Sequence, residues 1–317
     1  MSMETKTISN LSKSIIANLE KVIIGKKNIL EQVLACFFSQ GHLLIEDVPG
    51  TGKTMLARSL AGSIGCHFSR IQFTPDMLPS DITGVSIYNQ NNRKFEFKPG
   101  PVISQIVLAD EINRATPKTQ SALLEVMEEK QVTIDGVTHA MDLPFMVIGT
   151  QNPIEYEGTF PLPEAQLDRF LMKVTLGYPS MLEEIRVLEN QQIRHPIEEL
   201  KEVVTSSQVI KAQDQIKHIL VSQPVKRYIV DFVRATREHS DVYLGASPRG
   251  SLGLFKVGQA LAAIRGRDYV IPDDIKDIAE PVLAHRVIVQ PAAKLHGLTS
   301  NMIIQDLLDS VAVLSPE

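Results

Sequence analysis

The stretch Ile45–Leu56, IEDVPGTGKTML, decides the fold of this chain. Its second half, GTGKT, matches the end of the phosphate-binding pattern G-x-x-x-x-G-K-[ST], but counting back five positions from Gly52 gives Asp47, where the pattern has glycine. The apolar run HLLIE leads into the stretch, and a helical pattern over residues 55–64 follows it. A strand before and a helix after are the context that a phosphate loop requires, so the stretch predicts a nucleotide site.

The loop itself has the groups that a polyphosphate needs. Converging backbone N–H groups and the positive end of the following helix bind phosphate oxygens. Lys53 can reach the terminal phosphates, and the Thr54 hydroxyl can bind Mg²⁺. Asp47 needs only to turn the chain out of the strand, so Asp47→Gly should keep ATP binding. The residues expected to bind the nucleotide here are Asp47, Val48, Pro49, Gly50, Thr51, Gly52, Lys53, Thr54 and Met55.

Two further motifs supply polar groups after apolar runs. QIVLADE at 105–111 ends in Asp110 and Glu111. Asp110 can hold the water shell of Mg²⁺ opposite Thr54, and Glu111 can deprotonate the attacking water. Asn152, in GTQNP, follows the next apolar run, and ligands sit at the carboxyl ends of parallel strands. We therefore expect the Asn152 amide beside Glu111, although Asn152 alone would be an ordinary turn residue before proline.

The rest of the chain supports an α/β domain followed by a helical one. Apolar strands are expected at 42–46, 68–73, 105–111, 144–150 and 171–176, and helices at 11–21, 28–40, 55–64 and 117–129. This alternation predicts a parallel sheet covered by helices on both faces. After residue 180 no strong strand pattern appears, and helices are expected near 181–193, 223–238, 248–264 and 273–285. We expect a nucleotide-binding core at 1–180 and an all-α lid at 181–317.

Composition restricts the remaining choices. The chain has 317 residues with a net charge of −5, which argues against non-specific nucleic-acid binding. No apolar run approaches eighteen residues, so no membrane insertion is expected. The two cysteines, Cys36 and Cys66, are too few for a disulfide framework or a four-cysteine zinc site. They favour a reducing, cytoplasmic location.

Several longer segments resemble the MoxR family of AAA+ ATPases. These are VPGTGKT, LADEINRATPKTQSALLEVMEE, GTQNPIEYEGTFPLPEAQLDRF and GASPRG, and the similarity runs from about Ile24 to near Arg286. The resemblance implies an AAA+ core with a five-stranded parallel sheet and a helical lid. It also implies Mg²⁺-dependent ATP hydrolysis with ATP and Mg²⁺ as cofactors. Aspartate is typical of the family at the position of Asp47, so that residue is no departure within it.

The resemblance also assigns residues that the pattern alone could not. Gly25, in VIIGKKN, matches a segment that lines the adenine pocket, and Asn152 matches the sensor-one position. Arg169 matches the arginine finger, which acts on the nucleotide of the next subunit. Arg249 matches the sensor-two arginine, expected to contact the γ-phosphate of its own subunit. Arg114 is a further family-matching arginine whose role stays open. Residues 79–101 match a hairpin insert, and the turn at 135–136 matches a second hairpin.

An arginine that acts on a neighbour implies a ring, and AAA+ relatives are typically hexameric. The family resembles chaperones that mature or remodel other proteins, often alongside a partner with a von Willebrand A domain. Two alternatives stay open: a chelatase-type motor subunit for metal insertion, and a DNA-acting motor. The insert has Arg93, Lys94 and Lys98 but also Glu96, and this modest charge cluster favours a solvated hairpin over a DNA contact.

Overall fold

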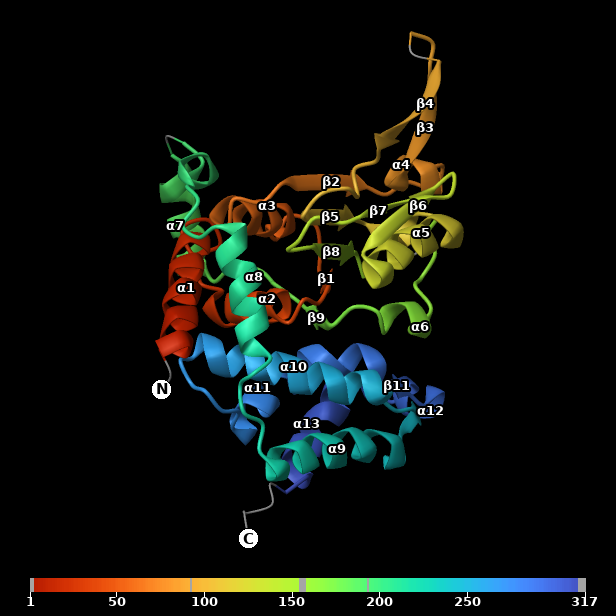
Figure 1. Ribbon diagram of the computed structural model, residues 1–317. Coiled ribbons are helices and arrows are strands. Elements are labelled where there is room, and N and C mark those ends of the chain that lie inside the picture. Colours follow the sequence, from red (N-terminus) through yellow and green to blue (C-terminus); the bar gives the residue numbers. More distant parts are fainter. Residues whose placement is uncertain (1–2, 92, 154–157, 193, 313–317) are drawn as a thin grey trace.

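A five-stranded, fully parallel sheet forms the centre of the core (Figure 1). The computed structural model describes residues 3–91, 93–153, 158–192 and 194–312. The strand order is β2-β5-β8-β1-β9, which confirms the predicted parallel sheet and all five predicted strands. The strands are β1 (Leu43–Glu46), β2 (Phe68–Gln72), β5 (Ile106–Asp110), β8 (Met146–Gln151) and β9 (Met172–Val174).

Burial explains why the inner strands appear in the sequence as continuous apolar runs. All five residues of β5 are buried, as are the first five of β8, because helices cover both faces of the sheet. The edge strand β2 is less apolar, and its polar residues include Arg70 and Gln72, two positions apart. Residues with this spacing lie on one face of a strand, so both side chains point the same way.

The four predicted core helices are present, the first of them longer at its N-terminal end, and the short helices α4 and α6 were not predicted. The first helix begins at Met3 rather than near residue 11. Thr5 and Ile8 are buried on the same face as Ser12 and Ile15, so the buried face extends toward the N-terminus. The core helices are α1 (Met3–Leu19), α2 (Lys27–Phe38), α3 (Lys53–Ser63), α4 (Pro79–Thr83), α5 (Pro117–Glu129) and α6 (Glu164–Leu167), with the 3₁₀ turn η1 (Ile112–Arg114).

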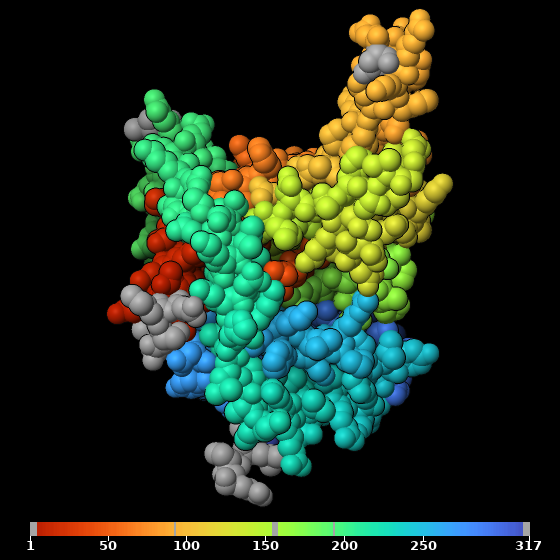
Figure 2. Space-filling model, viewed as in Figure 1, coloured from red at the N-terminus to blue at the C-terminus, as the bar shows by residue number. Residues whose placement is uncertain are grey.

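Two antiparallel hairpins interrupt the core, as the family resemblance implied. The first pairs β3 (Gly84–Asn89) with β4 (Lys94–Pro99) and projects far from the body of the molecule (Figure 2). The second pairs β6 (Gln131–Ile134) with β7 (Val137–Ala140). The hairpins touch each other where the rings of Phe97 and His139 stack, with centroids 4.1 Å apart.

The C-terminal part is mostly helical, with additions that the sequence reading missed. The four predicted helices are present, and α8, α12 and α13 were not predicted. A short antiparallel pair, β10 with β11, was also missed because neither strand is long enough to show an alternation. The elements are α7 (Met181–Gln191), η2 (Pro196–Glu199), α8 (Ser206–Ile216), α9 (Gln223–Glu238), β10 (Val242–Leu244), α10 (Pro248–Ile264), α11 (Pro272–Leu283), η3 (Ala284–Arg286), β11 (Ile288–Val289), α12 (Pro291–Leu295) and α13 (Ser300–Ser310).

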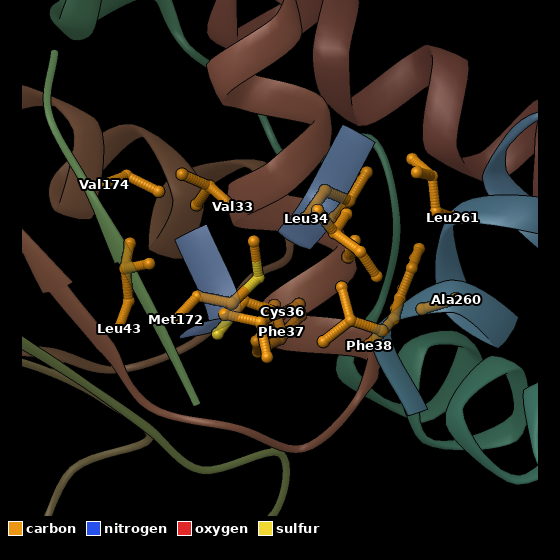
Figure 3. Close-up of a cluster of buried hydrophobic side chains, with 14 of the residues drawn as sticks. Val33, Leu34, Cys36, Phe37, Phe38, Leu43, Met172, Val174, Ala260 and Leu261 are labelled. Atoms are coloured by element: carbon orange, nitrogen blue, oxygen red, sulfur yellow. The ribbon is translucent and has the colours of Figure 1, made fainter. Parts of the chain in front are cut away.

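The helical part packs directly on the core through α10. Figure 3 shows Phe37 and Phe38 of α2 between Leu43 and Met172 of the sheet on one side and α10 on the other. All of these side chains belong to one buried cluster that continues into the helical part. We keep the boundary near residue 180 as a proposal, since the last strand of the sheet ends at Val174 and α7 begins at Met181.

Candidate functional site

The phosphate loop joins β1 to α3 at the carboxyl edge of the sheet. Gly50 and Gly52 have φ values of +87° and +92°, in the left-handed region that glycine adopts without strain. Gly52 is the N-cap residue of α3, and no side chain caps this helix. The first N–H groups of α3 therefore have no side-chain acceptor, which is the arrangement that binds an anion at a helix N-terminus.

Lys53 lies over the loop. Its ammonium group donates hydrogen bonds to the carbonyl oxygens of Asp47, at 2.7 Å, and of Val48, at 3.0 Å. The Thr51 hydroxyl donates to the same Val48 carbonyl at 3.3 Å. The lysine charge is thus held within the turn formed by residues 47–53, where it can meet a phosphate.

Asp47 does more than turn the chain. It is buried, its Oδ1 accepts from the Val48 N–H at 2.8 Å, and its Oδ2 accepts from the Gly177 N–H at 2.8 Å. The first bond is the local one expected of an aspartate in a turn. The second ties the start of the loop to the segment after β9, 130 residues away. No sequence pattern could indicate this second contact.

This contact leads to a specific expectation for Asp47. Asp47→Gly should still bind ATP, because the N–H groups from Gly50 to Thr54 are unchanged. It should lower the free energy of unfolding by about 1 to 2 kcal/mol, since it removes two hydrogen bonds to backbone donors. Asp47→Asn keeps an acceptor oxygen and serves as the matched variant, expected to lose less. Chemical denaturation and fluorescent-nucleotide titration measure the two effects, and loss of ATP binding in Asp47→Gly would contradict this account.

Asp110 sits at the end of β5 and is 8% exposed. Its Oδ1 accepts from the Thr150 hydroxyl at 2.6 Å, and its Oδ2 accepts from Arg70 Nη2 at 2.6 Å and Nε at 3.1 Å. Thr150 comes from β8 and Arg70 from β2, so both neighbouring strands hold this carboxylate. The arrangement fixes its direction before any ligand binds.

Glu111 follows in a left-handed conformation, with φ +57°. This conformation is uncommon for a residue with a side chain and is concentrated at functional sites. Its N–H donates to the Thr150 hydroxyl at 2.8 Å, and its Oε2 accepts from Gln72 at 2.7 Å and from Arg114 at 3.0 Å. Thr150 thus orients both acidic residues, and Arg114 gains a structural role beside the expected base.

Asn152 and Gly25 lie at the same edge of the sheet. Asn152 is buried one residue after β8 ends, and β8 pairs in parallel with both β5 and β1. Residues 154–157, which follow in the longer family-matching segment, lie outside the described residues. Gly25 contacts α7, since a Cβ at this position would overlap a carboxylate oxygen of Glu183. The same segment reaches the phosphate loop, because Ile23 Cδ1 would lie 3.6 Å from a Cβ on Gly52.

Arg169 and Arg249 meet at one carboxylate. Glu128, near the end of α5, accepts from Arg249 Nη2 at 2.9 Å and lies 3.2 Å from Arg169 Nη2. The two arginines come from different parts of the chain: Arg169 precedes β9, and Arg249 lies in the first turn of α10. Together with neighbouring residues they line a cavity of about 270 Å³.

This cavity lies at the edge of the sheet opposite the phosphate loop. Arg169 comes three residues before Met172, which pairs with Leu43 at the start of β1, whereas the loop follows the end of β1. The Leu171 N–H donates to the His42 carbonyl just before β1. A four-residue strand spans roughly 13 Å. The docking of α10 therefore places Arg249 beside Arg169, on the side of the sheet away from its own phosphate loop.

A buried arginine fixes the segment around Arg169. Arg286, 3% exposed, pairs with Asp168 Oδ1 at 2.7 Å and donates to the carbonyls of Phe170, at 2.7 Å, and Leu171, at 3.2 Å. It therefore binds residues on both sides of Arg169. Burial lowers the pKa of Arg286, and the adjacent Asp168 carboxylate opposes this shift.

A buried histidine links α5 to the sheet at the same edge. His42 Nδ1 accepts from the Val147 N–H, and Nε2 bonds the Met127 carbonyl at 2.9 Å. Burial lowers the pKa of His42 to about 4, so the ring stays neutral at physiological pH. This bond fixes the end of α5, and with it the position of Glu128.

The supporting residues around these motifs were missed by sequence reasoning. Thr150 lies inside the quoted motif GTQNP, and its place at a strand end two residues before Asn152 was a usable signal. Arg70 and Gln72 showed only as polar residues in an edge strand. Glu128 and Arg286 gave no local signal at all, because their partners are distant in the sequence.

Comparison with known proteins agrees with this geometry. Residues 42–172 match the family described as "ATPase family associated with various cellular activities (AAA)", and residues 234–307 match the AAA lid domain. A crystal structure of a candidate ATPase from Cytophaga hutchinsonii superposes with a TM-score of 0.91 at 40% identity, covering 98% of this chain and 97% of that one. The fold and the site thus define an AAA+ ATPase with a helical lid.

Curated relatives identify the family more narrowly. The chain is 52% identical to the uncharacterized protein YeaC of Bacillus subtilis, covering 94% of this chain and 93% of the relative. It is 42% identical to Chaperone MoxR1 of Mycobacterium tuberculosis, covering 94% and 81%, and 27% identical to Protein MoxR of Methylorubrum extorquens, covering 92% and 91%. This chain belongs to the MoxR family of AAA+ ATPases. Among the described residues, no helix is both long and apolar enough to cross a lipid bilayer.

Proposed function

We propose that this ATPase forms a ring, hydrolyses ATP between adjacent subunits with Mg²⁺, and uses the energy to remodel or mature partner proteins. One observation carries the proposal: Arg169 and Arg249 lie together at the edge of the sheet opposite the phosphate loop. Two guanidinium groups in one exposed cavity are suited to a phosphate. Since they are far from their own loop, the phosphate that they meet is that of a neighbour.

The chemistry divides between the two subunits. In one subunit, Lys53 and the loop N–H groups bind the β- and γ-phosphates. Glu111 takes a proton from the attacking water, and Asn152 positions that water or the γ-phosphate. From the neighbour, Arg169 and Arg249 stabilise the charge that develops on the γ-phosphate. Arg249 thus joins Arg169 as a group acting on the adjacent subunit.

The donor set suits Mg²⁺. Thr54 offers a hydroxyl oxygen and Asp110 a carboxylate oxygen, and Mg²⁺ prefers such hard oxygen ligands together with phosphate oxygens. Arg70 and Thr150 orient the Asp110 carboxylate. When bound, the ion would neutralise phosphate charge and polarise the γ-phosphate. Thr54 and Asp110 are the residues proposed to hold it.

A contact in which one edge of a subunit meets the opposite edge of the next is heterologous. Such a contact produces a ring when its rotation closes. We propose a homo-oligomeric ring, with six subunits as in typical AAA+ assemblies. The subunit binds ATP and releases ADP at each interface.

The proposed action on other proteins rests on the relatives. A protein 42% identical is named as a chaperone, which supports a chaperone-like role here. We propose a partner protein with a von Willebrand A domain and a cytoplasmic location. In the β3–β4 hairpin, Glu96 accepts a hydrogen bond from Asn89 at 2.9 Å. An acidic side chain on this hairpin does not favour DNA as the partner.

Affinity capture from the native cell tests the proposed remodelling. Glu111→Gln protein should hold a client in the ATP-bound state, because it binds ATP without hydrolysing it. Lys53→Ala protein, which binds no nucleotide, is the matched control. We expect client proteins enriched with Glu111→Gln and ATP and absent with Lys53→Ala. Capture of a metal-chelatase catalytic subunit, or of nucleic acid, as the main partner would contradict the chaperone-like role.

A further inference from the structure

Glu128 is the group that holds the two phosphate-binding arginines together. One carboxylate oxygen, Oε1, accepts from Arg249 Nη2 at 2.9 Å, and the other, Oε2, lies 3.2 Å from Arg169 Nη2. The side chains are 48% exposed for Arg249, 32% for Arg169 and 40% for Glu128. A single anion therefore bridges a cation of the core and a cation of the lid at an exposed site.

The second acid of the cavity behaves differently. Asp168 pairs with Arg286, which is 3% exposed, at 2.7 Å, and it accepts from the Ser247 hydroxyl at 3.1 Å. Its Oδ2 also lies 4.0 Å from Arg249 Nε, a longer contact than the 2.9 Å bond from Arg249 to Glu128. Breaking a buried ion pair leaves an uncompensated charge and is strongly destabilising, whereas an exposed pair exchanges partners at small cost. The Asp168–Arg286 pair is thus a fixed part of the fold, and the Glu128 pairs are the exchangeable ones.

A carboxylate and a phosphoryl group present the same kind of acceptor to guanidinium. Both offer two oxygens to parallel N–H donors. A phosphate that approaches Arg169 and Arg249 must take donors that Glu128 now occupies. A carboxylate remaining beside a γ-phosphate would also repel it, because both are negatively charged.

We propose that Glu128 is a built-in competitor of the neighbouring subunit's γ-phosphate. Its carboxylate forms ion pairs with Arg169 and with Arg249 until the γ-phosphate of ATP in the adjacent site displaces it. This inference rests on the proposed function, since it assumes that the two arginines meet a neighbour's nucleotide. Glu128 thereby raises the ATP concentration at which subunits engage each other, and it keeps both arginines paired when no triphosphate is present.

The test uses the full-length chain in the Glu111→Gln background, where assembly is measured without hydrolysis. Glu128→Gln removes the charge and nearly keeps the shape. We expect the ATP concentration for half-maximal assembly, measured by sedimentation velocity, to fall about three- to tenfold. Glu129→Gln is the matched control: it makes the same charge change on the next residue of α5, and that residue has no ion pair with either arginine. It should leave assembly unchanged.

A second readout separates competition from a structural role. With Glu111 intact, Glu128→Gln should lower the half-saturating ATP concentration without lowering kcat. Nucleotide binding to isolated subunits should stay at the parent value. An unchanged half-saturating concentration, or a loss of kcat like that of Arg169→Ala, would overturn the proposal. A parent chain that neither assembles nor hydrolyses ATP would instead overturn the proposed function, so the two failures are distinct.

Discussion

Glu111→Gln is expected to bind ATP as tightly as the parent chain and to hydrolyse it at least about a hundredfold more slowly. A positioned general base contributes roughly 10²- to 10⁴-fold to a proton transfer, and an amide cannot accept the proton of the attacking water. The substitution keeps the size of the side chain and an acceptor oxygen for Gln72 and Arg114, which now bond Oε2. Steady-state phosphate release and fluorescent-nucleotide titration measure the two quantities.

Two comparisons make this result specific to the base. Glu125→Gln, on the exposed face of α5, makes the same charge change away from the site and should hydrolyse ATP at the parent rate. Thr150→Val removes the hydroxyl that bonds both Asp110 and the Glu111 N–H, and it should lower kcat while leaving Glu111 in place. Hydrolysis by Glu111→Gln at the parent rate would show that another group takes the proton.

Arg169→Ala should bind ATP normally and lose at least about a thousandfold in kcat. An arginine supplied by a neighbour contributes roughly 10³- to 10⁵-fold to phosphoryl transfer. Its position opposite the phosphate loop predicts complementation. Lys53→Ala protein binds no nucleotide but still carries Arg169, so it should restore hydrolysis at an adjacent Arg169→Ala subunit. In a random one-to-one ring, about a quarter of the interfaces would pair the two productively.

The same mixing assay tests the placement of Arg249. Arg249→Ala should also be restored by Lys53→Ala if it acts on the neighbour. It should not be restored if it acts within its own subunit. Each variant alone, and a chain with both Lys53→Ala and Arg169→Ala, should stay inactive and serve as controls. The ring arrangement is wrong if mixing restores nothing while the parent chain hydrolyses ATP as a monomer at every concentration.

The fold was largely predictable because its signals are local. Four of the five sheet strands appear as apolar runs, and all five lie within a few residues of their predicted bounds. The glycines at positions 50 and 52 marked a turn that needs left-handed backbone, and both have positive φ. Helices α8 and α13 were missed, although Val209 and Ile303 are fully buried, because short amphipathic stretches give a weak periodic signal.

The candidate site was predictable only in part. Lys53, Asp110 and Glu111 could be found because strand–loop–helix context and residue spacing identify them. Thr150 was overlooked because its role depends on the register that brings β8 beside β5. The second contact of Asp47, to the Gly177 N–H, depends on the packing of β9 beside β1.

The sequence by itself determined the class of chemistry: a phosphate loop, a pair of acids after a buried strand, and two arginines that resemble those of one family. The tertiary structure alone decided on which side of the sheet those arginines lie. Arg249 is 80 residues from Arg169 and 121 from Glu128, and α10 brings the three together by packing on α2. Backbone geometry and apolar periodicity are properties of a few neighbouring residues. The docking of one domain on another depends on many weak contacts between residues that are far apart in the sequence. No short motif can therefore encode it.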